Sequence, residues 1–138
     1  MEEFYSKGKA VRAIIDPSIR AVIVHWNFLG NDDIVLECTR AQIEQVQKGA
    51  RSIIVDVTVA RGMLSETVQA YFEKNFFPAL AEAELRAVIT VTPRRELALA
   101  AAEHWAKTGE MFTFGMYETG TIEHARELAG QIASASGG

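Results

Sequence analysis

Two short runs of apolar, mostly β-branched residues constrain the fold of this 138-residue chain more than any other feature. They occupy residues 52–57 (SIIVDV) and 86–92 (RAVITVT). Runs of this length and composition are typical of strands that are covered on both faces. Apolar residues at helical spacing lie before, between and after the two runs. The chain is therefore expected to alternate strands and helices, which predicts an α/β fold with a mainly parallel sheet.

The first predicted helix begins at the polar residues 31–32, where asparagine and aspartate favour a helix start, and Gly49 is expected to end it. Its apolar face is expected to carry Leu36, Thr39, Ile43 and Val46.

The second predicted helix starts at Ser65, a good N-cap residue, and contains the most apolar stretch of the chain. Pro78 is expected to kink or break this helix near Phe77. Phe76 and Phe77 would point about 100° apart on a regular helix, so one helix face cannot bury both. Either the break turns both rings inward, or Phe77 reaches an apolar cavity or a partner surface.

The ends of the chain complete the predicted architecture. Turn residues at 16–18 separate two strand-like segments, and a further short strand is expected near residues 4–5. The last strand is expected at 111–117, between a helix that starts near residue 93 and a helix that starts near residue 122. These segments predict a mixed, mainly parallel sheet of about five strands with about four helices. Residues 1–133 would form one domain, and residues 134–138 a flexible tail.

Composition excludes several classes of protein. The chain carries 14 basic and 18 acidic residues, a formal net charge of −4, and has no basic stripe, so we expect no nucleic-acid partner. The apolar runs are too short to cross a bilayer, and the polar N-terminus does not resemble a signal peptide. The single Cys38 cannot form an internal disulfide, which fits a reducing compartment. We therefore expect a cytoplasmic protein that is not transmembrane.

Ligands of parallel sheets usually bind at the carboxyl ends of the strands, where helix N-termini converge. His25 and Trp26 end one predicted strand, and Arg61 and Ser65 follow the next. Because neighbouring strand residues point to opposite faces, only one of His25 and Trp26 can face a given pocket.

Arg94 and Arg95 break a local rule, because two cations in the first turn of a predicted helix oppose the helix dipole. An anionic ligand or acidic groups on a partner would compensate them. The alternative is that both side chains point into water, where the unfavourable dipole term is small.

No catalytic or metal-binding motif is present. The three histidines, His25, His104 and His124, have no second ligand at metal-site spacing, and no nucleophile can be paired with a base. Cys38 lies mid-helix and is interpreted as a buried, inert thiol. Glycine-rich phosphate-binding loops are also lacking. The sequence therefore predicts no enzyme activity, no cofactor and no metal.

Three segments resemble the SpoIIAA-like family of STAS/SEC14 domain-containing proteins, and the likeness spans residues 22–132. The first is VHWNF at 24–28, similar to the family's tryptophan-ended strand. The second and most specific is LSETVQ at 64–69 followed by NFFPA at 75–79. The third is MYE at 116–118 with EHA at 123–125. The resemblance implies a STAS-like fold, and its SEC14 part implies a lipid-like ligand.

The chain departs from the family pattern at two places. Phe76 replaces a tryptophan of the family. Anti-sigma-factor antagonists of this type carry Asp-Ser-Ser-Gly at the start of the helix after the central strand, and the second serine is phosphorylated. Here the corresponding run is LSET at 64–67, so Glu66 holds the phosphoacceptor position and the phospho-switch motif is not intact.

The main prediction is a non-enzymatic binding domain for an apolar or lipid-like small molecule. The alternative is a STAS-type regulatory protein–protein interaction module without an intact phospho-switch. A homodimer is left open by both. The predicted ligand-binding residues are His25, Trp26, Arg61, Ser65, Phe76, Phe77, Arg94 and Arg95.

Overall fold

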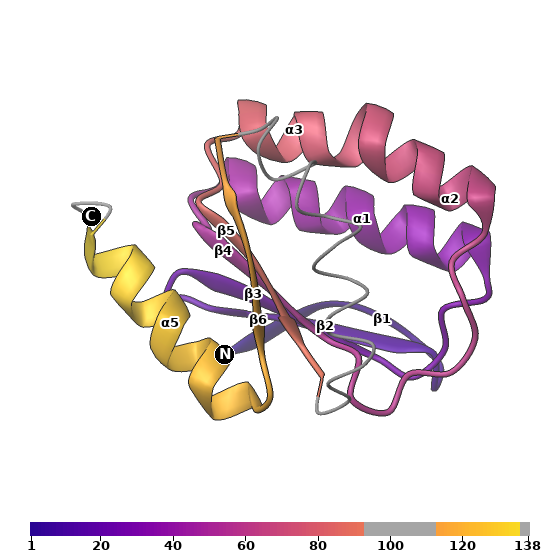
Figure 1. Ribbon diagram of the computed structural model, residues 1–138, viewed down its shortest axis with the longest axis horizontal. Helices are drawn as coiled ribbons and strands as arrows, with labels where there is room; N and C mark the ends of the chain where they lie inside the picture. The colour runs from indigo at the N-terminus through magenta and orange to yellow at the C-terminus, as the bar shows by residue number, and fades with distance from the viewer. Residues whose placement is uncertain (93–112, 136–138) are drawn as a thin grey trace.

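A computed structural model describes residues 1–92 and 113–135 (Figure 1). One six-stranded sheet runs through the molecule in the order β1-β2-β3-β4-β5-β6. Strands β1, β2 and β3 pair antiparallel, and β3 to β6 pair parallel. The strands span β1 Glu2–Lys7, β2 Val11–Asp16, β3 Ala21–Trp26, β4 Ser52–Asp56, β5 Ala87–Val91 and β6 Gly115–Thr119.

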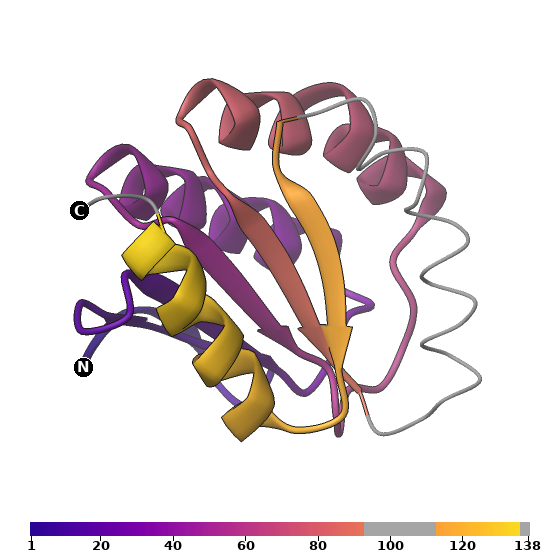
Figure 2. The same cartoon turned by 60° about the vertical axis from the view of Figure 1, so that its left-hand side comes forward.

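Helices cover both faces of this sheet. Helix α1 (Asp32–Gln47) and the continuous helical segment α2 (Glu66–Tyr71), η1 (Phe72–Phe76) and α3 (Phe77–Glu82) lie on one face. Helix α5 (Ile122–Ala135) lies on the other (Figures 1 and 2). The predicted α/β architecture is confirmed.

The central strands are buried on both sides, as their continuous apolar runs predict. Val24 and Ile53 belong to the core beneath α1, α2 and α3. Ile23 and Ile54, one position along each strand, belong to the separate core beneath α5. The two helical layers therefore do not share a core.

Both edge strands differ from the sequence prediction. The extra strand expected near residues 4–5 is present and is longer than predicted, with six residues, so the sheet has six strands, close to the predicted number of about five. Within the described residues the C-terminal strand spans Gly115–Thr119 and so extends two residues past the predicted end at 117, whereas residues 111–112 of the predicted strand lie outside the described residues. Helix α5 continues to Ala135, past the predicted start of the tail at residue 134. The helix predicted from residue 93 lies outside the described residues.

Helix α1 begins where the sequence indicates, because the Asn31 side chain accepts a hydrogen bond from the Ile34 N–H at 3.1 Å. Its buried face differs from the prediction, since Leu36 and Ile43 are only partly buried. The residues that α1 buries are Val35, Cys38, Thr39, Gln42 and Val46. Because the buried face of α1 includes the polar Gln42, a count of apolar residues alone does not identify this face.

Pro78 does not break the second helix. The backbone stays helical through Phe76 and Phe77, and one wide π turn forms, in which the Phe77 N–H bonds to the Phe72 carbonyl. A proline in a helix lacks an N–H and its ring crowds the carbonyl four residues earlier. The π turn lies immediately before the proline, which falls in the first turn of α3.

Candidate functional site

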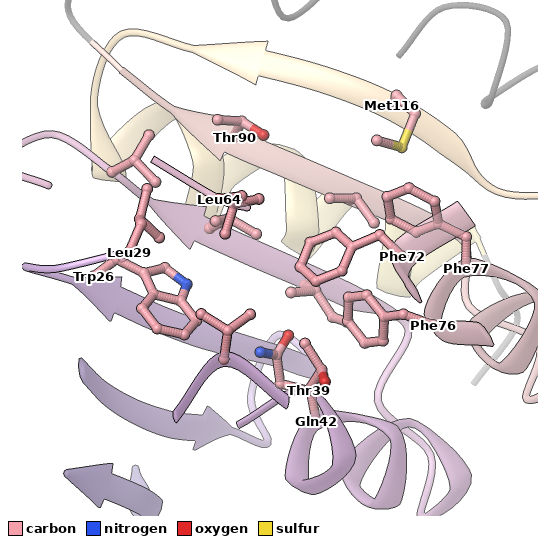
Figure 3. A pocket seen from close by; sticks show the side chains of 15 residues that line it. Trp26, Leu29, Thr39, Gln42, Leu64, Phe72, Phe76, Phe77, Thr90 and Met116 are labelled. Carbon is pink, nitrogen blue, oxygen red and sulfur yellow. The ribbon is translucent and has the colours of Figure 1, made fainter. Parts of the chain in front are cut away.

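An apolar cavity of about 160 Å³ lies between the sheet and the helical layer of α1, α2 and α3 (Figure 3). None of the described residues in its wall is charged, and only three are polar. The wall consists of Trp26, Leu29, Val35, Thr39, Gln42, Ile53, Val55, Val57, Leu64, Phe72, Phe76, Phe77, Val88, Thr90 and Met116.

Aromatic rings form much of this wall because of the π turn. The Phe72 ring centroid lies 5.1 Å from that of Phe76 and 5.7 Å from that of Phe77. Phe76 and Phe77 stack at 5.8 Å, and both are at most 5% exposed. On a regular helix these two rings would diverge, whereas the wider turn directs both inward. Trp26 at the end of β3 lies across the cavity from the phenylalanines (Figure 3).

Two polar residues of the wall, Thr39 and Gln42, differ in the hydrogen bonds that their side chains form. The Thr39 hydroxyl donates to the Leu36 carbonyl at 2.9 Å and lies 3.0 Å from the Tyr71 hydroxyl. Gln42 is 3% exposed, and its Nε2 donates to Cys38 Sγ at 3.4 Å. Within the described part of the chain this is the only hydrogen bond of the Gln42 side chain.

Cys38 is fully buried, and burial raises the pKa of its thiol to about 11, although the Gln42 hydrogen bond opposes this shift. A thiol with such a pKa stays protonated near neutral pH and is a poor nucleophile. This environment fits the interpretation of Cys38 as an inert core residue.

Two loops meet above the cavity at the carboxyl edge of the sheet. The loop after β3 and the loop after β4 exchange backbone hydrogen bonds, Leu29 N–H to the Arg61 carbonyl at 2.8 Å and Arg61 N–H to the Asn27 carbonyl at 3.0 Å. The Phe28 ring lies so close to Gly30 that a Cβ there would be 2.6 Å from it. A side chain at Gly30 would therefore displace the ring.

These loops expose large apolar side chains. Phe28 is 45% exposed, Val59 66% and Met63 82%. We call Phe28, Val59 and Met63 the loop surface. Residues next to them in sequence, Leu29 and Leu64, line the cavity. The two loops thus have an apolar outer side and an apolar inner side.

Ser65 links the two helix N-termini beside the loop surface. Its Oγ accepts from the Val68 N–H at 3.1 Å, which is the predicted N-cap, and donates to Asp32 Oδ2 at 2.9 Å. Asp32 lies in the first turn of α1. The side chain of Ser65 is therefore engaged as both donor and acceptor.

A histidine–aspartate pair lies on the opposite face of the sheet from the cavity. His25 Nδ1 is 2.9 Å from Asp56 Oδ2, and the other oxygen of Asp56 accepts from the Thr58 N–H and hydroxyl. Burial raises the pKa of Asp56, but the hydrogen bonds from Thr58 and His25 outweigh burial and lower it. Asp56 is thus ionised at neutral pH and orients the imidazole.

The structure brings together only some of the predicted ligand-binding residues. Trp26, Phe76 and Phe77 line the cavity, whereas His25 lies on the other face of the sheet. Arg61 is exposed beside the loop surface, and Ser65 caps α2. Arg94 and Arg95 lie outside the described residues.

Sequence reasoning missed Gln42 and the loop surface. Gln42 interrupts an apolar helix face at helical spacing from Cys38, Thr39 and Val46, and such a polar interruption is a usable signal for a lined cavity. Phe28 stands two residues before Gly30, and Met63 follows Gly62. Large apolar residues close to loop glycines are a weaker signal, in this case for an exposed apolar surface.

Within residues 1–92 and 113–135, no three histidine, cysteine, aspartate or glutamate side chains are grouped closely enough to hold a metal ion. None of the helices in these ranges has the length and apolar character needed to span a bilayer.

Replacing Ser65 by alanine is expected to lower the free energy of unfolding by about 1 kcal/mol, because the Val68 N–H loses its cap. Aspartate also caps helices, but here Ser65→Asp would place a second carboxylate beside Asp32 and is expected to destabilise the protein as well. Adding Asp32→Asn should recover the stability that Ser65→Asp loses, because it removes the second carboxylate. It should not recover the stability that Ser65→Ala loses. Urea denaturation of the four variants measures this. A Ser65→Asp protein as stable as wild type would contradict the Asp32 contact.

A solved structure shares this fold. It is that of a Thermotoga maritima protein described as a candidate anti-sigma factor antagonist, with a TM-score of 0.56 and 15% sequence identity. The match covers 85% of this chain and 92% of the other. No family model matches the chain, and no curated protein sequence matches it. The structural likeness confirms the predicted STAS-like fold, with its mixed sheet and helices on both faces.

Proposed function

We propose that this protein is a non-enzymatic, STAS-type regulatory module that docks onto a protein partner through its loop surface. The observation that carries the proposal is the exposure of Phe28, Val59 and Met63 on two adjoining loops. The Phe28 ring approaches Gly62 closely, which places it beside the residue that precedes Met63. Large apolar side chains that are exposed side by side often mark a surface that a partner covers. The structural neighbour, described as a candidate anti-sigma factor antagonist, supports a regulatory role. The protein would act in the cytoplasm.

Charge near the loop surface indicates the chemistry of the partner. Asp33 and Glu66 are exposed in the first turns of α1 and α2, and the carboxylate of Asp32 lies between these turns. Arg61 is the basic residue of the adjoining loop. The proposed partner is therefore a folded protein with an apolar groove and a predominantly basic rim.

This docking would not depend on phosphorylation of Ser65. The hydroxyl of Ser65 already donates to one group and accepts from another, and a phosphate there would face the Asp32 carboxylate. The next position is already occupied by an acidic residue, Glu66. The proposed module is thus docking-competent without a phospho-switch.

Site-specific photo-crosslinking in the native host tests the proposal. A crosslinker at position 63 is expected to form one discrete adduct with another protein, and a crosslinker at Glu127, exposed on α5, is expected to form none. Phe28→Ser should reduce the adduct at position 63 at least fivefold, because it removes an apolar anchor. Mass spectrometry would identify the adduct.

Two outcomes would overturn the docking proposal. One is equal labelling from positions 63 and 127, and the other is an adduct that Phe28→Ser does not weaken. An adduct with a second copy of this chain would show that the surface serves a homodimer instead of a regulatory partner.

Binding of an apolar small molecule remains the second candidate function, and the cavity is the observation that favours it. Trp26, Phe76 and Phe77, predicted to bind ligand, all lie in the cavity wall. Leu29, Val57 and Leu64 belong to the same loops as the loop surface and also line the cavity. A ligand in the cavity would therefore contact the inner side of the proposed docking loops.

A further inference from the structure

We propose that the cavity binds one compact, uncharged, mostly apolar molecule of the size of a substituted aromatic ring, whose single hydrogen-bonding group pairs with the side-chain amide of Gln42. This inference rests on the second candidate function, small-molecule binding. It goes further by assigning the ligand class and the polar anchor.

The volume of the cavity sets the size of the ligand. An apolar cavity of about 150 Å³ in another protein stays dry and accommodates benzene. The cavity here, about 160 Å³, is of that size and is smaller than the roughly 300–1,000 Å³ of sites for drug-sized ligands or cofactors. A long acyl chain would leave most of its length outside. The lipid-like ligand implied by the SEC14 resemblance is therefore less suited to this space than a single ring.

The wall determines the chemistry of most of the ligand. The rings of Phe72, Phe76 and Phe77 lie on one side of the cavity, and Trp26 lies on another (Figure 3). Aromatic side chains favour tilted or stacked contacts with a further ring. A charged ligand would lose its hydration without meeting an opposite charge in the described wall, which is strongly unfavourable.

Gln42 provides the polar anchor. A glutamine amide offers two N–H donors and an oxygen with two acceptor sites. Here the Nε2 has one weak sulfur acceptor at 3.4 Å, and the amide oxygen has no partner in the described residues. The side chain is nonetheless 3% exposed and is directed toward the space between Trp26 and the phenylalanines (Figure 3). Among the described residues, the enclosed side-chain oxygen or nitrogen without a partner is Ser52 Oγ, so the unpaired Gln42 oxygen still has accessible surface that a ligand can reach. A ligand hydroxyl or amine that pairs with this amide would gain affinity.

The other polar wall residues are less suited to this role. Both the donor and an acceptor site of the Thr39 hydroxyl are used by Leu36 and Tyr71. Thr90 lies on β5 at the other side of the cavity from Gln42 and is only partly buried (Figure 3). Thr90 therefore serves as a matched control, since Thr90→Val removes a polar wall group without touching Gln42.

Titration with phenol and toluene tests the anchor, because these probes share a shape and differ in one hydroxyl. Binding is followed by the NMR shifts of the Val55 and Val88 methyl groups in the wall. Both probes are expected to shift these methyls saturably, and phenol is expected to bind at least as tightly as toluene. Gln42→Leu, which keeps the side-chain volume similar, should weaken phenol relative to toluene about tenfold. Thr90→Val should leave the ratio unchanged.

The outcomes separate the inference from the function on which it rests. If neither probe shifts the methyls, small-molecule binding itself is wrong. If both bind and Gln42→Leu leaves the phenol-to-toluene ratio unchanged, the cavity binds ligand but Gln42 is not the anchor. If 1-decanol, which has a hydroxyl and a long chain, saturates the same methyls more tightly than phenol does, the assigned size class is wrong.

Discussion

Replacing Trp26 by alanine is expected to lower the free energy of unfolding by about 3–5 kcal/mol. Trp26 is 5% exposed, ends β3 opposite Val11 of β2, and forms part of the cavity wall. Truncation would remove the contacts of the indole and enlarge the cavity that Trp26 lines. Each additional cubic ångström of cavity costs about 24 cal/mol. Urea denaturation followed by far-UV circular dichroism measures the loss.

Two variants control for this experiment. Trp26→Phe keeps an aromatic ring in the wall and should lose clearly less stability than Trp26→Ala. Val59→Ala truncates an exposed loop residue and should change the free energy of unfolding by less than about 0.5 kcal/mol. If Trp26→Ala and Val59→Ala unfold at the same urea concentration, Trp26 does not support the core as the structure indicates.

The central part of the fold is predictable from sequence because its strands are buried on both faces. β4 and β5 have continuous apolar runs, and an alternating chain with such runs has few architectures available. The edge strands lack this signal. β1 reads EEFYSK and β6 reads GMYET, and each pairs with only one described strand. Partly exposed strands tolerate polar residues and glycine, so their boundaries cannot be read from hydrophobicity.

The cavity was only partly predictable for a similar reason. The sequence shows that Phe76 and Phe77 exceed what one face of a regular helix can bury. It does not show that a π turn between Phe72 and Phe76 resolves the conflict, because that turn depends on packing around the helix. Gln42 was missed because a polar residue counts against the face that it occupies. Its burial follows from the orientation of α1 on the sheet, a tertiary property.

The loop surface illustrates a further limit. Exposure of Phe28 and Met63 depends on how the loops after β3 and β4 pair with each other. Apolar residues in sequence are normally assigned to the core, and no helical or strand period marks these as exceptions. Ser65 was found because an N-cap is a local feature, whereas its contact with Asp32, 33 positions away, is not.

Replacing Asp16 by asparagine is expected to lower the free energy of unfolding by about 2–4 kcal/mol, because it removes the charge of a buried carboxylate that pairs with the partly exposed Arg126. Asp16 is 4% exposed at the end of β2. One carboxylate oxygen accepts from the Ser18 N–H at 3.0 Å and from its hydroxyl at 2.6 Å, and the other accepts from Arg126 of α5. This residue therefore joins the β2–β3 turn to the last helix.

The loss should depend on pH in a defined direction. Hydrogen bonds from Ser18, together with the guanidinium of Arg126, outweigh burial and hold the pKa of Asp16 below its usual value. Because the pKa of Asp16 is lower in the folded state, its ionisation stabilises the fold. This contribution is complete at pH values above the pKa of the unfolded state, about 4, and is lost as the pH falls through the pKa of the folded state. The difference between wild type and Asp16→Asn should therefore be constant from pH 7 to pH 5 and shrink below about pH 4.

Arg126→Met tests the contribution of the ion pair apart from the contribution of the Ser18 hydrogen bonds in the turn. It should also destabilise the protein, because it leaves the buried carboxylate without its cation, and the double variant with Asp16→Asn should lose less than the sum of the two single losses. Glu127→Gln, an exposed carboxylate next to Arg126 in sequence, should change stability by less than about 0.5 kcal/mol at any of these pH values. Strictly additive losses in the double variant would show that Asp16 acts through the Ser18 turn alone and that α5 is held by its apolar face.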